Sequence, residues 1–316
     1  MSFTITNGPQ WHDTTGAQIQ AHSGGMHIED GVYYWYGTHM GPGVTGNVVD
    51  VGVVCYRSTD LMNWEPLGPI LTPINEDGHD IRKGCRMERP KIVKHADGRY
   101  LMWFHWVESG CGHESARTGV AEADSITGPF RYLGTLNPDG WDPRDQTLFK
   151  DTDGSVYHVY AAGQALRCNR TINISLISDD YRRPSGMWTP AFAERSMEAP
   201  AIINKDGRYW MFCSGCSGWN PNRCRVAWAD NMLGPWYESG DPCREHADED
   251  TSVMYHSQPN YAFELVAKPG HFVLMADRWN GQDHHQSRPI WLPILFDDQG
   301  MASLNWYAEW GPEVWG

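Results

Sequence analysis

The sequence has few basic residues and no cluster of them. Its 316 residues include 25 Lys and Arg against 39 Asp and Glu, so the formal net charge at pH 7 is −14. Binding to a nucleic-acid backbone depends on clustered Lys and Arg that neutralise phosphates. The composition therefore argues against nucleic acid as a partner.

Long apolar runs are also missing. No stretch approaches the roughly 18 apolar residues of a membrane-spanning helix, so we expect no membrane partner. The opening residues, MSFTITNGPQWHDTTG, contain neither the basic start nor the apolar stretch of a secretory signal. As the sequence is written we expect a cytoplasmic protein, or a secreted or periplasmic one if the N-terminus was trimmed.

Common motifs for a nucleophilic serine, for phosphate binding and for metal binding are absent or weak. There is no G-x-S-x-G serine elbow and no phosphate-binding G-x-x-x-x-G-K-[ST] loop. Without a signal, free thiols are the expectation for the eight cysteines, and the irregular spacing of four of them does not favour a zinc site. Adjacent His284 and His285 would point apart on an extended chain. We therefore predict no metal site and no required cofactor. The cysteines are at positions 55, 85, 111, 168, 213, 216, 224 and 243.

A repeated phrase is the strongest feature that is present. Five segments combine a tight Gly-containing turn with a run of aromatic and β-branched residues, which is typical of a hairpin. They are DGVYYWYGTH (30–39), DGRYLMWFHW (97–106), DGSVYHVYAA (153–162), DGRYWMFCSG (206–215) and PGHFVLMADRW (269–279). The turns recur roughly every 50 to 70 residues, which is the size of a four-stranded propeller blade.

The repeat and the composition together predict an all-β fold. The 33 Gly and 20 Pro leave no long helical stretch, and a β-sandwich would not repeat at this period. We predict one domain over residues 1–316, a five-bladed β-propeller with about four strands per blade. Most of the 16 Trp are expected to fill the core.

One polar residue recurs at the start of each expected innermost strand, close to the mouth of the central channel. Crowded carboxyls raise one another's pKa, which is costly for a structural protein but useful where one acid must stay protonated. The alternative is that each residue caps its own blade. Paired acids beside aromatic residues are typical of glycoside hydrolysis. The residues are His22, Glu88, Asp145, Glu198 and Gln258.

Several motifs, in order along nearly the whole chain, resemble glycoside hydrolase family 43, and within it the exo-β-1,3-galactanase (galactan 1,3-β-galactosidase) branch. The resemblance implies an inverting hydrolase that removes terminal β-1,3-linked galactose from galactan or arabinogalactan side chains. Some relatives carry an appended carbohydrate-binding module, and we expect none in residues 1–316. A structural calcium in the central channel is compatible with the resemblance, but none of its ligands is assigned. The motifs are DTTGAQIQAHSGG (13–25), YYWYG (33–37), MERPKIV (87–93), GRYLMWFH (98–105), RDQTLFKDTDG (144–154), EAPAI (198–202), SGCSGWNPN (214–222), SQ (257–258) and MADRW (275–279).

The resemblance also assigns roles to residues. Glu198 matches the general acid, and Asp145 matches the acid that tunes its pKa and holds the sugar. Glu88 matches an active-site glutamate. His22 stands where most of the family has an aspartate base, and Gln258 matches a glutamine proposed to hold the nucleophilic water. Gln258 and Glu88 are thus the two candidates for positioning the water.

One departure from the branch concerns the sugar. The branch usually reads WYGE after the first turn, and the resemblance implies that this glutamate helps to recognise galactose, whereas this chain has Thr38 and His39 after WYG. We expect Thr38, His39 and His22 to contact the substrate. An α-L-arabinofuranosidase or β-galactofuranosidase is therefore an alternative. A non-catalytic glycan-binding propeller is another, although such a protein has no need of Glu198. Trp219 is expected to stack on a sugar, and Arg278 either contacts the substrate or a carboxylate or bridges blades five and one.

Overall fold

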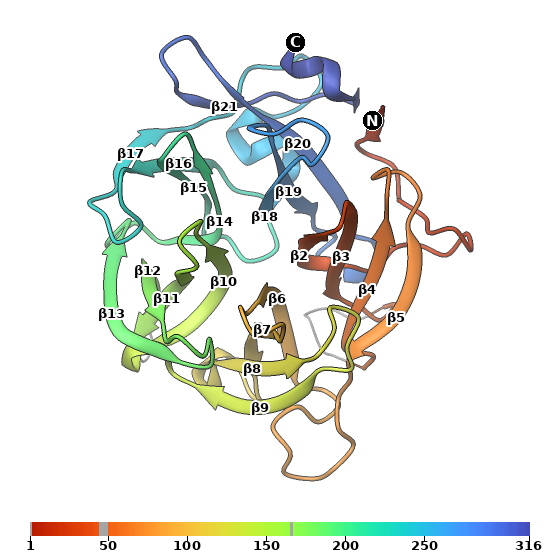
Figure 1. Ribbon diagram of the computed structural model, residues 1–316, viewed down its shortest axis with the longest axis vertical. Coiled ribbons are helices and arrows are strands. Elements are labelled where there is room, and N and C mark those ends of the chain that lie inside the picture. Colours follow the sequence, from red (N-terminus) through yellow and green to blue (C-terminus); the bar gives the residue numbers. More distant parts are fainter. Residues whose placement is uncertain (1, 44–49, 165–166) are drawn as a thin grey trace.

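The computed structural model describes residues 2–43, 50–164 and 167–316. The side chains of residues 164–169 are not described. Five four-stranded antiparallel sheets surround a central channel, which confirms the predicted five-bladed β-propeller (Figure 1). Within each blade the strands follow one another from the channel outward in chain order. The strand that begins each blade therefore lines the channel.

The blades have the following strands. Blade one contains β2 (His22–Glu29), β3 (Val32–Thr38), β4 (Val53–Ser58) and β5 (Glu65–Leu71). Blade two contains β6 (Arg86–Lys94), β7 (Tyr100–Val107), β8 (Arg117–Ala123) and β9 (Arg131–Leu136). Blade three contains β10 (Asp142–Lys150), β11 (Val156–Gln164), β12 (Arg167–Ile177) and β13 (Pro184–Ala191). Blade four contains β14 (Met197–Lys205), β15 (Arg208–Gly215), β16 (Cys224–Ala229) and β17 (Tyr237–Gly240). Blade five contains β18 (Gln258–Glu264), β19 (Phe272–Arg278), β20 (Arg288–Phe296) and β21 (Ala302–Leu304).

Helices are short in the described part of the chain. All are 3₁₀ turns, and none is long and apolar enough to cross a membrane. They are η1 (His113–Ser115), η2 (Pro138–Gly140), η3 (Thr251–His256), η4 (His284–Gln286) and η5 (Pro312–Trp315).

The two ends of the chain meet and close the ring. Strand β1 (Ile5–Thr6) pairs with β22 (Glu309–Trp310) in a small antiparallel sheet. The Asn7 amide donates to the Trp291 carbonyl at 2.9 Å and accepts from the Trp291 N–H at 2.9 Å. The first residues of the chain are thereby tied to the last blade.

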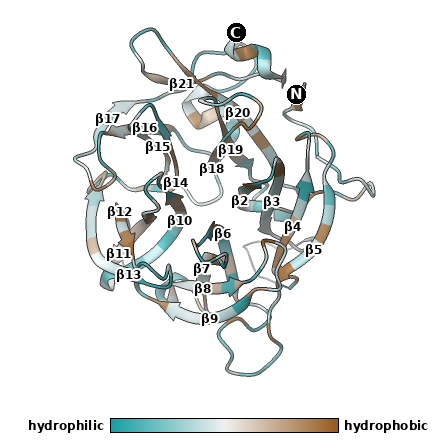
Figure 2. Cartoon of the chain, in the orientation of Figure 1, coloured by the Kyte–Doolittle hydropathy of each residue, from teal (hydrophilic) through white to brown (hydrophobic). Residues whose placement is uncertain are grey.

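The core lies between the blades, with one apolar cluster at each of the five blade contacts. Between blades one and five, the ring of Trp35 lies 5.3 Å from that of Trp64 and 5.1 Å from that of Trp291. Burial of each such ring contributes about 2 kcal/mol or more. Hydrophilic residues predominate in the loops around the rim (Figure 2). The Trp-rich composition thus serves packing between blades.

The predicted turns are present but differ in length. Asp30–Gly31 and Asp206–Gly207 are two-residue turns in which both residues have positive φ, the geometry for which Asp-Gly is suited. In blades two and three the paired strands are separated by longer turns, residues 95–99 and 151–155.

Each innermost strand has a β-bulge shortly after it begins. In β2, β6, β10 and β14 two consecutive residues are left out of the pairing with the next strand, and in β18 one residue is. The first bulge residue in three of these strands, Ser23, Arg89 and Ala199, has φ near +50°. Bulges bend a strand and re-aim its side chains, so the bulges determine what faces the channel mouth.

Candidate active site

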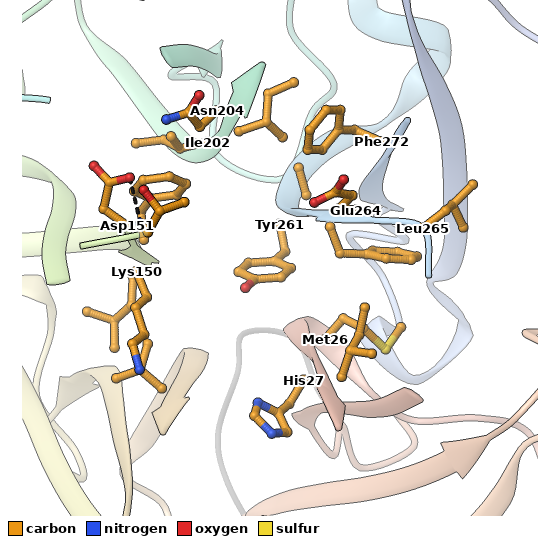
Figure 3. Close-up of a pocket in the computed structure, with 18 of the residues that line it drawn as sticks. Met26, His27, Lys150, Asp151, Ile202, Asn204, Tyr261, Glu264, Leu265 and Phe272 are labelled. Carbon is orange, nitrogen blue, oxygen red and sulfur yellow. Dashed lines mark hydrogen bonds between the residues drawn. The ribbon is translucent and has the colours of Figure 1, made fainter. Parts of the chain in front are cut away.

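The channel opens into a cavity at each end. The larger one, about 850 Å³, lies at the end where the innermost strands finish. Figure 3 shows it lined mainly by apolar side chains such as Ile202 and Phe272. Its two acids already serve the fold: Asp151 accepts from the Tyr209 hydroxyl, and Glu264 accepts from the Gly270 N–H. The described residues that line this cavity therefore include no carboxyl pair poised for chemistry.

The smaller cavity, about 370 Å³, lies where the innermost strands begin. It brings together four of the five polar residues that the sequence placed at this mouth. Blade one contributes Ser23 in place of His22. The described lining residues are Ser23, Arg86, Glu88, Arg89, His105, His113, Arg144, Asp145, Glu198, Gly218, Trp219, Gln258 and Trp279.

Glu198, at the start of β14, has the properties of a proton donor. Burial, and next the nearby charge of Asp145, raise the pKa of Glu198 from its ordinary 4.5 to about 8. The charge of Arg89 and hydrogen bonds from Cys216 and Gln258 act in the opposite direction. Glu198 therefore carries its proton at neutral pH.

Asp145 stands beside Glu198 but not at the register that the sequence suggested. Pro143, not Asp145, is the last residue of β10 paired before the bulge, as Glu88 and Glu198 are in their strands. Asp145 lies within the bulge, two positions further on. Counting back from the Asp-Gly turn misplaced it because turn 151–155 is longer than turn 206–207. The bulge nevertheless directs Asp145 into the cavity.

Arg89 links Asp145 to Gln258 within the cavity, and sequence reasoning missed it. Its Nε lies 2.8 Å from Asp145 Oδ1, and its Nη2 donates to Gln258 Oε1 at 2.7 Å. Its Nη1 donates to the Pro259 carbonyl at 2.9 Å. The side chain is 4% exposed. A charged residue directly after Glu88, in an otherwise buried strand, was the available signal.

Gln258 is in contact with the general-acid candidate. Its Nε2 donates to Glu198 Oε1 at 3.0 Å and to Ser214 Oγ at 3.1 Å. Its Oε1 accepts from Arg89 and from Trp279 Nε1, the latter at 2.9 Å. Both amide hydrogens and the carbonyl oxygen are thus in use.

Glu88 has the opposite electrostatic environment to Glu198. It is buried, which acts to raise its pKa, but His105 and His113 outweigh that effect and lower the pKa to about 2. His105 Nδ1 lies 2.9 Å from Glu88 Oε2, and the rings of His105 and His113 stack with centroids 5.5 Å apart. Burial and His105 lower the pKa of His113 to about 4. Neither histidine was predicted; His105 within the aromatic run WFHW was the signal.

Two tryptophans form an aromatic wall of the cavity. Trp219, predicted as a sugar-stacking residue, lines the cavity together with Trp279. Their rings meet edge to face with centroids 5.2 Å apart, and the ring of His284 lies 4.0 Å from that of Trp219. An indole face held in this way can pack against the apolar face of a pyranose.

Four residues proposed for substrate binding do not line the cavity. His22 is 2% exposed and bonds to Gln20 Oε1, and the fully buried Thr38 donates to the Met87 carbonyl at 2.6 Å. The ring of His39 lies 6.4 Å from that of His285. Arg278 pairs with Glu249 at 2.9 Å and stacks over Trp306, both C-terminal to blade four, so it does not bridge blades five and one. We do not propose these four as sugar contacts.

The described side chains offer no ready metal site. No group of three or more His, Cys, Asp or Glu among them is arranged to hold an ion. Seven cysteines are free thiols, and Cys168 lies outside the residues whose side chains are described. Cys213 lies in β15, as predicted.

Known proteins share the sequence pattern and the five-bladed fold of this chain. A family model described as glycosyl hydrolases family 43 matches residues 23–286. A solved GH43 β-1,3-galactosidase with galactodeoxynojirimycin shares 37% identity, covers 97% of this chain and 99% of its own, and superposes with a TM-score of 0.91. An exo-β-1,3-galactanase of Phanerochaete chrysosporium with galactose shares 30% identity over 98% of this chain and 68% of its own, with a TM-score of 0.87.

Curated sequences are more distant. An extracellular endo-α-(1→5)-L-arabinanase of Thermotoga petrophila is 24% identical over 282 residues, covering 77% of this chain and 54% of the relative. The chain spans about half the length of the curated relatives it matches. With a family match over most of its length and a solved relative at 37% identity, the chain belongs to glycosyl hydrolase family 43.

Proposed function

We propose that this chain is an exo-acting, inverting glycoside hydrolase that releases terminal β-1,3-linked galactose from galactan or arabinogalactan side chains. The observation that carries the proposal is the Glu198–Asp145 pair. Asp145 is held by Arg89 at 2.8 Å, and its charge helps raise the pKa of Glu198 to about 8. Cleavage of a glycosidic bond requires an acid that is still protonated at the working pH, and the charge of Asp145 helps to keep Glu198 in that form.

Each acid has one role in the proposed reaction. Glu198 gives its proton to the leaving glycosidic oxygen as the bond to the anomeric carbon breaks. Asp145 keeps Glu198 protonated and grips the sugar. Glu88, ionised across the working pH range because its pKa is about 2, positions the attacking water and accepts its proton. A weak base suffices where the water attacks a carbon that is already oxocarbenium-like.

Three observations support a galactoside as substrate. Several solved relatives with 30% or more identity are named as acting on β-1,3-linked galactose. The cavity of about 370 Å³ is at the small end of the range for ligand sites, which suits capture of a chain end. Trp219 and Trp279 offer the aromatic surface for a pyranose.

A furanosidase remains the second candidate, for a specific reason. Thr38 is fully buried with its hydroxyl on the Met87 carbonyl, and Ser23 is the lining residue that blade one supplies among those described. Among the described residues, no acid of blade one lines this cavity to take the place of the galactose-recognising glutamate. An α-L-arabinofuranoside or β-galactofuranoside would not need that contact.

Proton NMR of the first product tests the proposal. The protein is incubated with a β-1,3-galacto-oligosaccharide and, separately, with arabinofuranoside and galactofuranoside oligomers. Early appearance of free α-galactose, before mutarotation, is the expected result. Early β-galactose would contradict inversion, and release from furanosides alone would establish the second candidate. A protein that releases no sugar but binds on a glycan array would be a non-catalytic propeller.

A further inference from the structure

A groove of about 500 Å³ lies on the outside of the ring, between blades two and three. One wall is β9 of blade two, and the other is the connection from β12 to β13 of blade three. Both β9 and β13 are the outermost strands of their blades (Figure 1). The described lining contains three basic side chains, Arg131, Arg182 and Arg183, and one acid, Asp180. We call this feature the arginine groove.

The arginine groove is basic although the whole chain has a net charge of −14. Buried Glu122 pairs with both Arg131 and Arg182. It also pairs with Arg99, but Arg99 has Asp97 as a second partner. One carboxylate is thus shared between two groove arginines, and the side chain of Arg131 remains 70% exposed. Because a guanidinium presents a fork of N–H donors that matches an oxyanion, the groove favours a ligand with carboxylate or sulfate groups.

Both walls of the arginine groove lead to an exposed pair of tryptophans. β9 ends at Leu136, and the short turn η2 then leads to Trp141. β13 begins directly after Arg183 and contains Trp188. The rings of Trp141 and Trp188 meet edge to face with centroids 5.6 Å apart. Trp188 is 37% exposed, and no other Trp in the described part of the chain is as exposed, so this pair is set apart from the core tryptophans.

The tryptophan pair is continuous with the catalytic cavity. Trp141 directly precedes β10, in which Arg144 and Asp145 line that cavity. At about 3.3 Å per residue, the Cα of Trp141 lies within about 13 Å of the Cα of Asp145. The fourth strand of each blade is antiparallel to the first, so β9 and β13 both run toward the end of the ring at which β10 begins. A path therefore leads from the cavity over the tryptophans to the arginines.

The path suits a polysaccharide whose end occupies the cavity. An exposed indole face packs against the apolar face of a pyranose, and exposed apolar patches mark binding surfaces. We propose that the tryptophan pair and the arginine groove bind an acidic galactan, a β-1,3-galactan chain that carries carboxylate or sulfate groups. The indoles hold pyranose rings close to the cavity, and the arginines pair with acidic groups further along the chain. The identity of the sugar rests on the proposed function.

Two matched pairs of polymers test the proposal by binding alone. One pair is an arabinogalactan that carries glucuronate and the same polymer with its carboxylates reduced to alcohols. The other is a β-1,3-galactan with and without sulfate esters. In affinity gel electrophoresis, the Kd of the unmodified protein should be roughly fivefold to tenfold lower for the acidic member of at least one pair. Raising NaCl from about 0.05 M to about 0.5 M should remove the difference, because salt screens exposed charges.

Substitutions separate the two parts of the site. Trp188→Ala should raise the Kd of all four polymers roughly fivefold, because the contact of the indole with the sugar is lost. Arg183→Gln should raise the Kd of the preferred acidic polymer and leave that of its neutral match unchanged. Tyr237→Ala and Arg57→Gln are the matched controls, since both side chains are about half exposed on other blades, and they should bind as the parent does. Thermal melting checks the folding of each variant.

Turnover gives a readout that a structural role for Trp188 would not move. The ratio of kcat/KM on the preferred polymer to kcat/KM on 4-nitrophenyl β-galactopyranoside should fall in Trp188→Ala about as much as the Kd rises. A side chain that only supports the fold would lower both values together and leave the ratio unchanged.

The inference and the proposed function fail separately. Equal Kd values within both pairs of polymers, or an equal rise in Kd in Trp188→Ala and Tyr237→Ala, would overturn the inference and leave the hydrolase intact. So would a parent protein that sediments as a dimer and becomes a monomer in Trp188→Ala, because a second copy would then cover the tryptophans. A protein that binds the acidic polymer but releases no galactose from any substrate would instead lose the proposed function and keep the binding site.

Discussion

Glu198 and Glu88 have the same side chain and line the same cavity, but their surroundings shift their pKa values in opposite directions. Burial and the charge of Asp145 raise one to about 8, while two histidines lower the other to about 2. The pair is thereby divided into a donor and an acceptor of protons over a wide pH range.

The pH profile should report this division. In the proposed reaction Glu198 must be protonated, so kcat/KM should be flat at neutral pH and fall tenfold per pH unit above about 8. The ionised form of Glu88 persists down to about pH 2, so it sets no limb near neutrality. The measurement is kcat/KM from pH 4 to 10. A decline centred near 4.5 would mean that Glu198 titrates as an ordinary glutamate.

The raised pKa of Glu198 should also cost stability. Between its ordinary 4.5 and about 8, the unfolded chain has released the proton while the folded chain still holds it, so stability falls as pH rises. Glu198→Gln cannot titrate and should be more stable than the parent at pH 8 by on the order of 4 kcal/mol, the free energy that corresponds to a pKa raised from 4.5 to about 8. The difference should vanish near pH 4.

Thermal melting at both pH values measures this effect. Glu245→Gln, at an exposed position, serves as the matched control and should change the melting temperature little at either pH. Equal melting of Glu198→Gln and the parent at pH 8 would show that the site does not strain the folded state.

At the scale of the element, the two-residue hairpins and the bulges occupy opposite ends of the innermost strands. The Asp206–Gly207 turn needs positive φ at both residues, and a Cβ on Gly207 would meet no atom within 4 Å. Gly207→Ala should therefore lower the free energy of unfolding by about 1 kcal/mol through backbone strain alone. The activity should not change, because the turn lies at the far end of the channel from Glu198.

Denaturant unfolding checks the turn prediction. Gly207→Asn is the matched control, since Asn tolerates left-handed backbone better than Ala and should destabilise the protein less. A loss of activity in Gly207→Ala would mean that the turn affects the cavity that contains Glu198 at the other end of the channel.

The same two ends explain what the sequence could and could not predict. The hairpins have a local signal, Asp-Gly followed by an aromatic strand, and they led to the blade count and to the acids at the opposite mouth. The bulges have no such signal. Where two residues of one strand lie opposite a single residue of the next, the alternation of inward and outward side chains shifts, and this shift is known only once the strand pairing is known. Arg89 and the placement of Asp145 depend on bulges, and His105 faces the cavity from the neighbouring strand. These were the parts of the site that sequence reasoning missed or misplaced.

The whole molecule is a ring, and its closure depends on a few contacts near the chain ends. Asn7 is 4% exposed and bonds to Trp291 O, Trp291 N and Tyr307 O. Asn7→Ala should destabilise the protein by about 1–3 kcal/mol, because it removes the acceptor of the buried Trp291 N–H, whereas the Trp291 carbonyl keeps the Trp310 indole as a donor. Activity at low temperature should persist, since no cavity residue changes.

Thermal melting with an activity assay at 25 °C checks the closure prediction. The neighbouring Thr6→Ala is the control, because its side chain makes only a 3.5 Å bond at the surface. Equal melting of Asn7→Ala and the parent would locate the closure of the ring elsewhere.

Because β1 pairs with β22, the ring is closed between the first and last blades, and its arrangement does not depend on which blade comes first in the chain. With Phe3 packed on Trp310 at 5.7 Å, the two ends are near enough for a short peptide to join them. The chain can then be reopened in an exposed connection such as residues 75–79, between blades one and two, without removing a strand pair. Such a circular permutant should keep every contact around Glu198. The cavity that contains Glu198 would then depend on closure of the ring and not on the blade at which the chain starts.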